Sequence, residues 1–168
     1  MALKHLTFAL AGEAATLALG AALAPALVPG LKIYLHGDLG AGKTTFARGL
    51  LCALGRKGPV KSPTYALVEI YVISGYILYH FDFYRFNRPE EWLEAGFDEH
   101  FNESSICLVE WPEKAAGMLP VADVDVRFEF DADPAGAARS VLIEASSEHG
   151  EQCLNAVRHL STRSLGRT

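Results

Sequence analysis

Eight residues from Gly37 to Thr44 have the spacing of a phosphate-binding loop. Their sequence, GDLGAGKT, matches GxxxxGK(S/T), in which the glycines let the backbone fold around phosphate oxygens with its amide groups pointing inward. A short apolar segment that favours a strand precedes the loop, and a segment that favours a helix follows it, which is the context that the motif requires. The sequence therefore predicts a nucleotide site at the N-terminus of a helix.

The residues of this loop have different expected roles toward the nucleotide. Lys43 would reach the β- and γ-phosphates, and the Thr44 hydroxyl would be a ligand of Mg²⁺. Thr45 and the loop amides would hold the α- and β-phosphates. The other loop residues predicted to bind the nucleotide are Asp38, Leu39, Gly40, Ala41 and Gly42. The Asn/Thr-Lys-x-Asp sequence usual in guanine-specific P-loop proteins does not occur, so ATP or ADP is the favoured ligand.

Two apolar segments, YILYHFD and ICLVE, end in the carboxylates Asp82 and Glu110. Both segments resemble the Walker B pattern, in which a buried strand presents an acid at its C-terminal end, where ligands bind in open α/β sheets. Phosphoryl transfer needs a carboxylate near Mg²⁺ and a group that positions the attacking water. We predict Thr44, Asp82 and Glu110 as the metal site, and Lys43 with the two acids as catalytic residues. Without the loop, a solvated carboxylate at a strand end would be the plainer interpretation of either acid.

Four neighbouring residues allow two interpretations each. Thr64, in the sequence SPTY, offers a hydroxyl in a loop that could cover the γ-phosphate, or it belongs to a simple turn. Arg85 either neutralises phosphate charge or pairs with a surface acid. His80 packs or hydrogen-bonds on its strand, and Trp111 is more often a core or interface aromatic than a catalytic group.

The elements that must position these residues alternate between strands and helices. This order predicts an α/β, P-loop NTPase-like fold with a mainly parallel sheet, flanking helices and antiparallel hairpin strands. One hairpin turns at Ser74-Gly75, and a later one has the turn-rich segment 131–136 between its strands. Strands are expected over 31–36, 65–73, 76–83, 105–110, 123–130 and 139–145. Helices are expected over 13–24, 44–54, 88–95 and 147–160.

Composition sets limits on the class of protein. A length of 168 residues corresponds to one domain, expected over 1–160, followed by a loose tail over 161–168. With 50% apolar and 21% charged residues, the chain is globular and not disordered. The net charge of −5 argues against general electrostatic binding to nucleic acid or to an anionic membrane.

The first thirty residues and the three cysteines indicate the cellular compartment of the protein. The apolar run over 17–28 is broken by Pro25 and is too short to span a bilayer, so it predicts a core helix more than a secretion signal. Three widely spaced cysteines without a CxxC pair fit reduced thiols. We therefore expect a cytoplasmic protein with no membrane contact.

Four longer segments, taken in order, resemble the TsaE family of bacterial P-loop ATPases that act in forming threonylcarbamoyladenosine in tRNA. These segments are GDLGAGKTTFARGL (37–50), KSPTYALVE (61–69), HFDFYRF (80–86) and LVEWPE (108–113). The loop motif alone would be generic, whereas four segments in this order over most of the chain are specific to the family.

The resemblance implies an ATPase that uses ATP and Mg²⁺ and works with TsaB-type and TsaD-type proteins, the latter a threonylcarbamoyl transferase. It implies Mg²⁺ at Thr44 and Glu110, with Asp82 close to the metal and Thr64 in a nucleotide-sensing loop. It also implies that Glu13 and Thr16 lie near the base, with a further contact from 136–139. Binding of tRNA would be indirect, through the partner subunits.

Two other classes of function stay open at this point. A small-molecule kinase of this size usually carries an arginine-rich lid, whereas the arginines here are scattered. A phosphorylated acceptor would identify a kinase. A nucleotide sensor that assembles a complex without hydrolysis would support product formation equally well with a non-hydrolysable ATP analogue.

Overall fold

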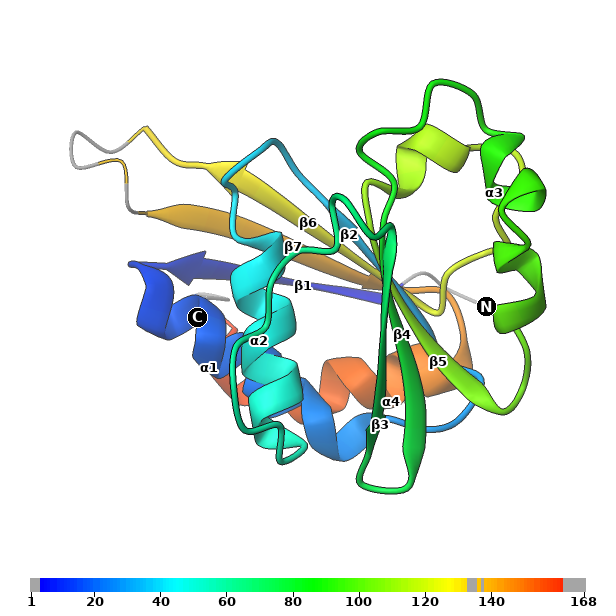
Figure 1. The fold of residues 1–168 in the computed structure, drawn as a ribbon. Coiled ribbons are helices and arrows are strands. Elements are labelled where there is room, and N and C mark those ends of the chain that lie inside the picture. The colour runs from blue at the N-terminus through cyan, green and yellow to red at the C-terminus, as the bar shows by residue number, and fades with distance from the viewer. Residues whose placement is uncertain (1–3, 133–135, 137, 162–168) are drawn as a thin grey trace, which may run out of the picture.

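A seven-stranded sheet forms the centre of the molecule, with strand order β1-β7-β6-β2-β5-β4-β3 (Figure 1). The computed structural model describes residues 4–132, 136 and 138–161. The strands are β1 (Lys4–Leu10), β2 (Lys32–His36), β3 (Val68–Ile73), β4 (Tyr76–Asp82), β5 (Ser105–Glu110), β6 (Val124–Phe130) and β7 (Arg139–Ala145). The helices are α1 (Glu13–Leu23), α2 (Lys43–Ala53), α3 (Glu91–Glu94) and α4 (Glu148–Val157), and the 3-10 turns are η1 (Ala24–Ala26), η2 (Phe97–His100), η3 (Pro112–Ala115) and η4 (Arg158–Leu160).

The sheet is mixed, with its parallel pairs at the centre. Strand β2 runs parallel to β5 and β6, and β4 runs parallel to β5. The outer pairs β1-β7, β6-β7 and β3-β4 are antiparallel; β3-β4 and β6-β7 are the two expected hairpins, whereas the β1-β7 pair was not expected. Because β2, β4 and β5 share one direction, their C-terminal ends meet at one edge of the sheet, and ligands bind at this edge in α/β folds.

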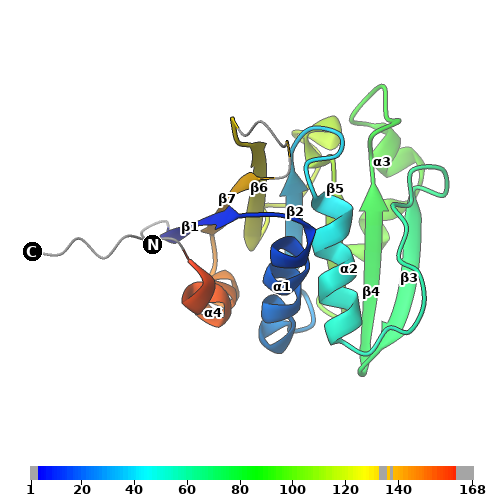
Figure 2. The same ribbon diagram turned by 90° about the vertical axis from the view of Figure 1, so that its left-hand side faces the viewer.

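Side chains alternate along the central strands between two cores. In β5, Ile106 and Leu108 belong to a core shared with α1, α2 and α4, whereas Cys107 and Val109 belong to an aromatic core with α3 and η2. Figures 1 and 2 show α1 and α2 side by side, with α3 at a distance from them. Because successive side chains in a strand point to opposite faces of the sheet, the position of a residue in the strand decides which of the two cores it packs into.

Helices α1 and α2 approach each other closely at two glycines. A Cβ atom on Gly20 would lie 2.2 Å from the carbonyl oxygen of Phe46, and one on Gly49 would lie 2.2 Å from the carbonyl oxygen of Leu17. Backbone atoms cannot yield as the tip of a flexible side chain can. The two glycines therefore set how near α2, which begins at the loop motif, lies to α1.

We expect Gly49→Ala to lower the free energy of unfolding by about 2 kcal/mol, because an overpacking cost of about 3 kcal/mol exceeds the gain of about 1 kcal/mol in helix propensity. Urea unfolding of both proteins measures this difference. Gly12→Ala is the matched control, because a Cβ there meets nothing within 4 Å and the φ of 178° suits any residue. Equal stability of wild type and Gly49→Ala would contradict the close approach.

Three segments differ from what the sequence predicts. Residues 4–10, for which no element is expected, form β1 and pair with β7. The expected strand over 65–73 begins only at Val68, because Leu67 has a φ of 67° and closes a turn on Pro63. The expected helix over 88–95 is shorter, because residues before Glu91 form turns in which the amides of Glu91 and Trp92 donate to the carbonyl oxygens of Arg88 and Pro89. Helix α3 ends before Gly96, as expected, and Gly96 has a φ of 74°. Residues 162–168 of the expected tail lie outside the described residues.

Cys52, Cys107 and Cys153 are free thiols, and burial raises the pKa of Cys107 and Cys153 to about 12. Among the described residues, no helix is both long and apolar enough to cross a membrane.

Candidate functional site

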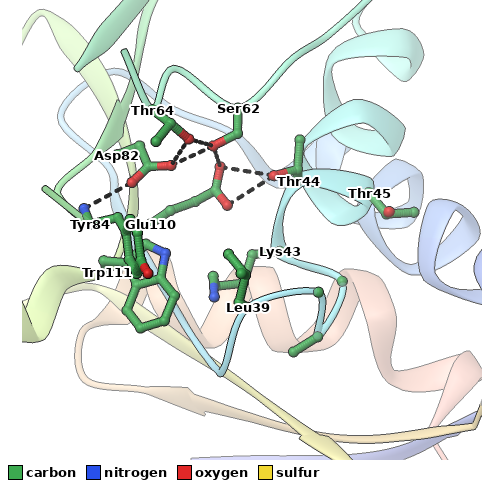
Figure 3. A pocket seen from close by; sticks show the side chains of 13 residues that line it. Leu39, Lys43, Thr44, Thr45, Ser62, Thr64, Asp82, Tyr84, Glu110 and Trp111 are labelled. Carbon is green, nitrogen blue, oxygen red and sulfur yellow. Dashed lines mark hydrogen bonds between the residues drawn. The ribbon is translucent and has the colours of Figure 1, made fainter. Parts of the chain in front are cut away.

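The loop motif connects the end of β2 to the first residue of α2 (Figure 3). Gly40 and Gly42 have φ angles of 77° and 116°, in the left-handed region that favours glycine. A Cβ on Gly37 would lie 2.9 Å from the carbonyl oxygen of Phe128 in β6, so the loop leaves the sheet without room for a side chain. The loop amides at the start of α2 therefore have the arrangement that binds anions.

Lys43 is a buried cation within this loop. Its ammonium group donates hydrogen bonds to the carbonyl oxygens of Gly37 and of Asp38, the latter at 3.1 Å. It also lies 3.9 Å from the centre of the Trp111 ring. Burial lowers the pKa of Lys43, and the negative charge of Glu110 opposes that shift in part. A buried ammonium group that is surrounded by carbonyl oxygens and an aromatic ring is suited to bind an anionic ligand.

Asp82 and Glu110 lie opposite each other in the parallel β4-β5 register, each at the end of its strand. Both side chains face α2 and both residues are only 2% exposed. Buried carboxylates are costly unless they are hydrogen-bonded. Lys43, His80, Asp82 and Glu110 make up four of the six buried polar or charged residues found in the described part of the chain, and such clusters mark functional sites.

Hydroxyl groups from two other elements hold the acids (Figure 3). Thr44, in the first turn of α2, donates to the two Glu110 oxygens at 3.0 and 3.3 Å. Thr64 donates to Asp82 Oδ2 at 3.0 Å, and Ser62 contacts the same oxygen and lies 3.4 Å from Glu110 Oε2. The loop over 61–65 is therefore tied to both strand ends.

A pocket opens between these groups, and its walls carry most of the residues predicted from the sequence. The lining residues are Leu39, Gly40, Ala41, Gly42, Lys43, Thr44, Thr45, Ser62, Thr64, Asp82, Tyr84, Glu110 and Trp111. Within the described residues, no three His, Cys, Asp or Glu side chains are grouped to hold a metal by themselves. Mg²⁺ is commonly bound by one or two carboxylates together with substrate phosphates, and the oxygens of Thr44, Asp82 and Glu110 fit that chemistry.

A second pocket adjoins the first across the loop, since both share Gly40, Ala41, Gly42 and Thr45. Its other walls are Gly12, Glu13, Thr16, Arg48 and Arg139. Arg48 lies 3.3 Å from the Glu13 carboxylate, and Arg139 donates to the Gly40 carbonyl oxygen at 3.4 Å. The segment before α1 and the start of β7 thus reach the loop from the side opposite the acids.

Some expected residues lie elsewhere, and others were missed. The Asp38 side chain is absent from both pocket walls, although its carbonyl oxygen accepts from Lys43. Arg85 stacks on Tyr65 at 4.1 Å and lines a separate pocket. Ser62 and Arg48 were not predicted as site residues. The position of Arg48 one helical turn after Thr44 is a signal that could have revealed it.

Comparisons with known proteins identify the family of the chain. A sequence model described as "Threonylcarbamoyl adenosine biosynthesis protein TsaE" matches residues 10–141. The chain belongs to the TsaE family. Relatives named "tRNA threonylcarbamoyladenosine biosynthesis protein TsaE" include one from Haemophilus influenzae, 48% identical over 75% of this chain and 77% of the relative. Another, from Rickettsia conorii, is 38% identical over 70% of this chain and 67% of the relative.

A solved structure titled as Bacillus subtilis YdiB superposes with a TM-score of 0.78 at 29% identity, covering 95% of this chain and 98% of that one. The predicted P-loop NTPase-like α/β fold and the predicted TsaE resemblance are therefore confirmed. As a member of the TsaE family, the protein has the family's role in tRNA threonylcarbamoyladenosine biosynthesis. The matched residues include the loop motif, the 61–65 loop and both acids.

Proposed function

We propose that this TsaE-family protein is a Mg²⁺-dependent ATPase whose turnover serves the formation of threonylcarbamoyladenosine in tRNA. The observation that carries the proposal is the contact between Thr44, at the N-terminus of α2, and Glu110, which lies opposite Asp82 at the end of β5. It joins a phosphate-binding loop to a pair of buried carboxylates. Phosphoryl transfer requires that combination.

The backbone amides and side chains of the site have different roles in hydrolysis. The amides of Gly40 to Thr45 bind the phosphate oxygens, and Lys43 supplies positive charge to the β- and γ-phosphates. Asp82 and Glu110 accept hydrogen bonds and orient the attacking water. Thr64 contacts Asp82, so movement of its loop changes the arrangement of the acids.

Thr44, Asp82 and Glu110 are the residues that would hold Mg²⁺. The ion, when bound, neutralises charge on the phosphates during transfer. The second pocket receives the nucleoside, with Glu13 and Thr16 on the wall formed by α1.

The partners in this proposal are a TsaD-type threonylcarbamoyl transferase and a TsaB-type subunit in the cytoplasm. A net charge of −5 supports indirect contact with tRNA, because nucleic-acid binding relies on positive surface charge. Among the described residues, Lys43 is the only lysine or arginine that lines the loop pocket, and Arg85 lines another pocket. The isolated protein should therefore hydrolyse ATP slowly, and the partner complex should accelerate it.

The test measures phosphate release from ATP by the full chain, alone and with the TsaB–TsaD-type complex, with and without Mg²⁺. Mg²⁺-dependent release that rises with the partners supports the proposal. A labelled small-molecule acceptor would identify a kinase instead. Equal tRNA modification over many cycles with a non-hydrolysable analogue would identify a non-hydrolytic assembly factor.

Tyr65 offers a way to separate partner docking from catalysis. The residue is 84% exposed, lines no part of the loop pocket, and lies one position after Thr64. We expect Tyr65→Ala to keep the rate of the isolated protein and to reduce stimulation by the partners about tenfold, because exposed tyrosines often dominate interfaces. Trp111→Ala is less clean, since Trp111 also contacts Lys43.

Stimulation is measured by titrating the partner complex into wild type, Tyr65→Ala and the control Val121→Ala. Val121 is a comparably exposed residue, at 80%. If Tyr65→Ala and Val121→Ala respond alike, Tyr65 takes no part in docking.

A further inference from the structure

His80 lies directly behind the acid pair, in a position that the proposed roles leave unused. It belongs to β4, two residues before Asp82, and therefore faces the same side of the sheet. The side chain is wholly buried, and its Nε2 atom lies 2.7 Å from Glu110 Oε2. It is absent from the pocket wall, so it acts on Glu110 from the interior side.

The hydrogen-bond partners of the ring determine where its proton lies. An ionised carboxylate only accepts, so the contact with Glu110 requires a hydrogen on Nε2. Among the described residues, Nδ1 has no hydrogen-bond partner. A neutral ring protonated at Nε2 leaves only a lone pair unmatched, whereas a hydrogen on Nδ1 would leave a buried donor without an acceptor. The geometry therefore selects the Nε2–H form.

The donors around Glu110 hold its two oxygens differently. Oε2 accepts a hydrogen bond from His80 and lies 3.4 Å from the Ser62 hydroxyl. Oε1 is the oxygen closer to the Thr44 hydroxyl, at 3.0 Å against 3.3 Å for Oε2. His80 thus fixes Oε2 toward the interior and leaves Oε1 at the N-terminus of α2. Without His80, the carboxylate would lose a fully buried donor and could turn toward Ser62 or Lys43.

We propose that His80 is a positioning residue that orients Glu110 so that one of its oxygens is presented to a divalent cation beside Thr44. This inference rests on the proposed function. Hydrogen-bonding partners behind metal ligands typically contribute about 10–100-fold to metal affinity.

The first test needs neither nucleotide nor metal. Long-range ¹H–¹⁵N correlation spectra of the protein labelled at histidine nitrogens distinguish the two neutral forms of the ring, and the His80→Gln spectrum assigns the signal. We expect protonated Nε2 and bare Nδ1. A hydrogen on Nδ1 would overturn the proposal, whatever the protein's activity.

The second test measures Mn²⁺ affinity in the presence of ADP by electron paramagnetic resonance. We expect His80→Leu to weaken Mn²⁺ binding about 10–100-fold with ADP affinity in the absence of metal unchanged. His80→Gln places an amide donor near the Nε2 position and should restore most of the affinity. His100→Leu is the matched control, because that imidazole stacks on Tyr79 at 4.2 Å and contacts neither acid.

Equal losses in His80→Leu and His80→Gln would overturn the proposal, because His80 would then serve packing alone. Wild-type affinity in His80→Leu would overturn it as well. If His80→Leu does not fold, the His80→Gln measurement and the wild-type spectrum still decide the matter. A wild type that binds ADP but no Mn²⁺ would instead refute the proposed Mg²⁺-dependent function, and the spectrum alone would then decide the role of His80.

Discussion

Replacing Lys43 with methionine is expected to reduce ATP turnover by about 10²–10³-fold, the usual effect of removing one preorganised charge from a phosphoryl-transfer site. Methionine preserves much of the length of the side chain but cannot make the cation–π contact of the ammonium group with Trp111, so the loss reports on charge. ATP binding should weaken as well, because the ammonium group interacts with the ground-state phosphates. Phosphate release and calorimetric ATP binding measure the two effects.

The same substitution should not reduce stability. Burial lowers the pKa of Lys43, so folding disfavours its charged form. The resulting destabilisation of wild type is fully present below the lowered folded-state pKa. It disappears as the pH rises toward the ordinary lysine value of 10.5. Urea unfolding of wild type and Lys43→Met at neutral and alkaline pH checks this sign.

Lys57→Met is the matched control, because Lys57 is exposed after the end of α2 and belongs to neither pocket. Lys57→Met should turn over ATP like wild type. If Lys43→Met and Lys57→Met have the same turnover and ATP affinity, Lys43 is not part of the site. The assignment of the loop as a phosphate-binding loop would then be wrong.

Glu110→Gln is expected to reduce turnover by a similar factor, about 10²–10³-fold, while metal-free nucleotide binding persists. Glutamine keeps the shape of the side chain but removes the charge that would hold Mg²⁺. Asp82→Asn should act in the same direction, because Asp82 faces the same pocket. Turnover is measured across a range of Mg²⁺ concentrations, and nucleotide binding is measured in the presence of a chelator.

Glu129→Gln, which removes an exposed charge on β6, serves as the control for net charge. Full turnover in Glu110→Gln or Asp82→Asn, under conditions in which wild type is active, would refute the role of that acid.

The chemistry of the site could be predicted because its signals are local in sequence. The loop motif carries its own spacing, and Asp82 and Glu110 each end an apolar segment that is strand-like by itself. A parallel register then brings the two acids together, as expected for neighbouring strands that end at the same edge. Local patterns of this kind predict a site well, because each one specifies both a strand and the end of that strand at which ligands bind.

What could not be predicted depends on contacts between distant segments. Ser62 contacts both acids only because the turn at Leu67 folds its loop back over the strand ends. His80 acquires its partner through the β4-β5 register, which no single segment encodes. Strand β1 has an alternating pattern, with Leu6, Phe8 and Leu10 buried, but its partner lies near the other end of the chain.

The position of β7 between β1 and β6 has a consequence for how the chain folds as the ribosome makes it. Strand β1 is made well before β7, its strand partner, and Lys4 lies opposite Ala145. Strands β2, β4 and β5 can pair earlier in synthesis, whereas β1 must wait until β7 has been made, and such non-local pairing is slow. A chain stopped before β7 would leave β6 as an unpaired edge and the apolar side of β1 uncovered, a form prone to aggregation. The risk of aggregation during synthesis therefore persists until β7 has been made.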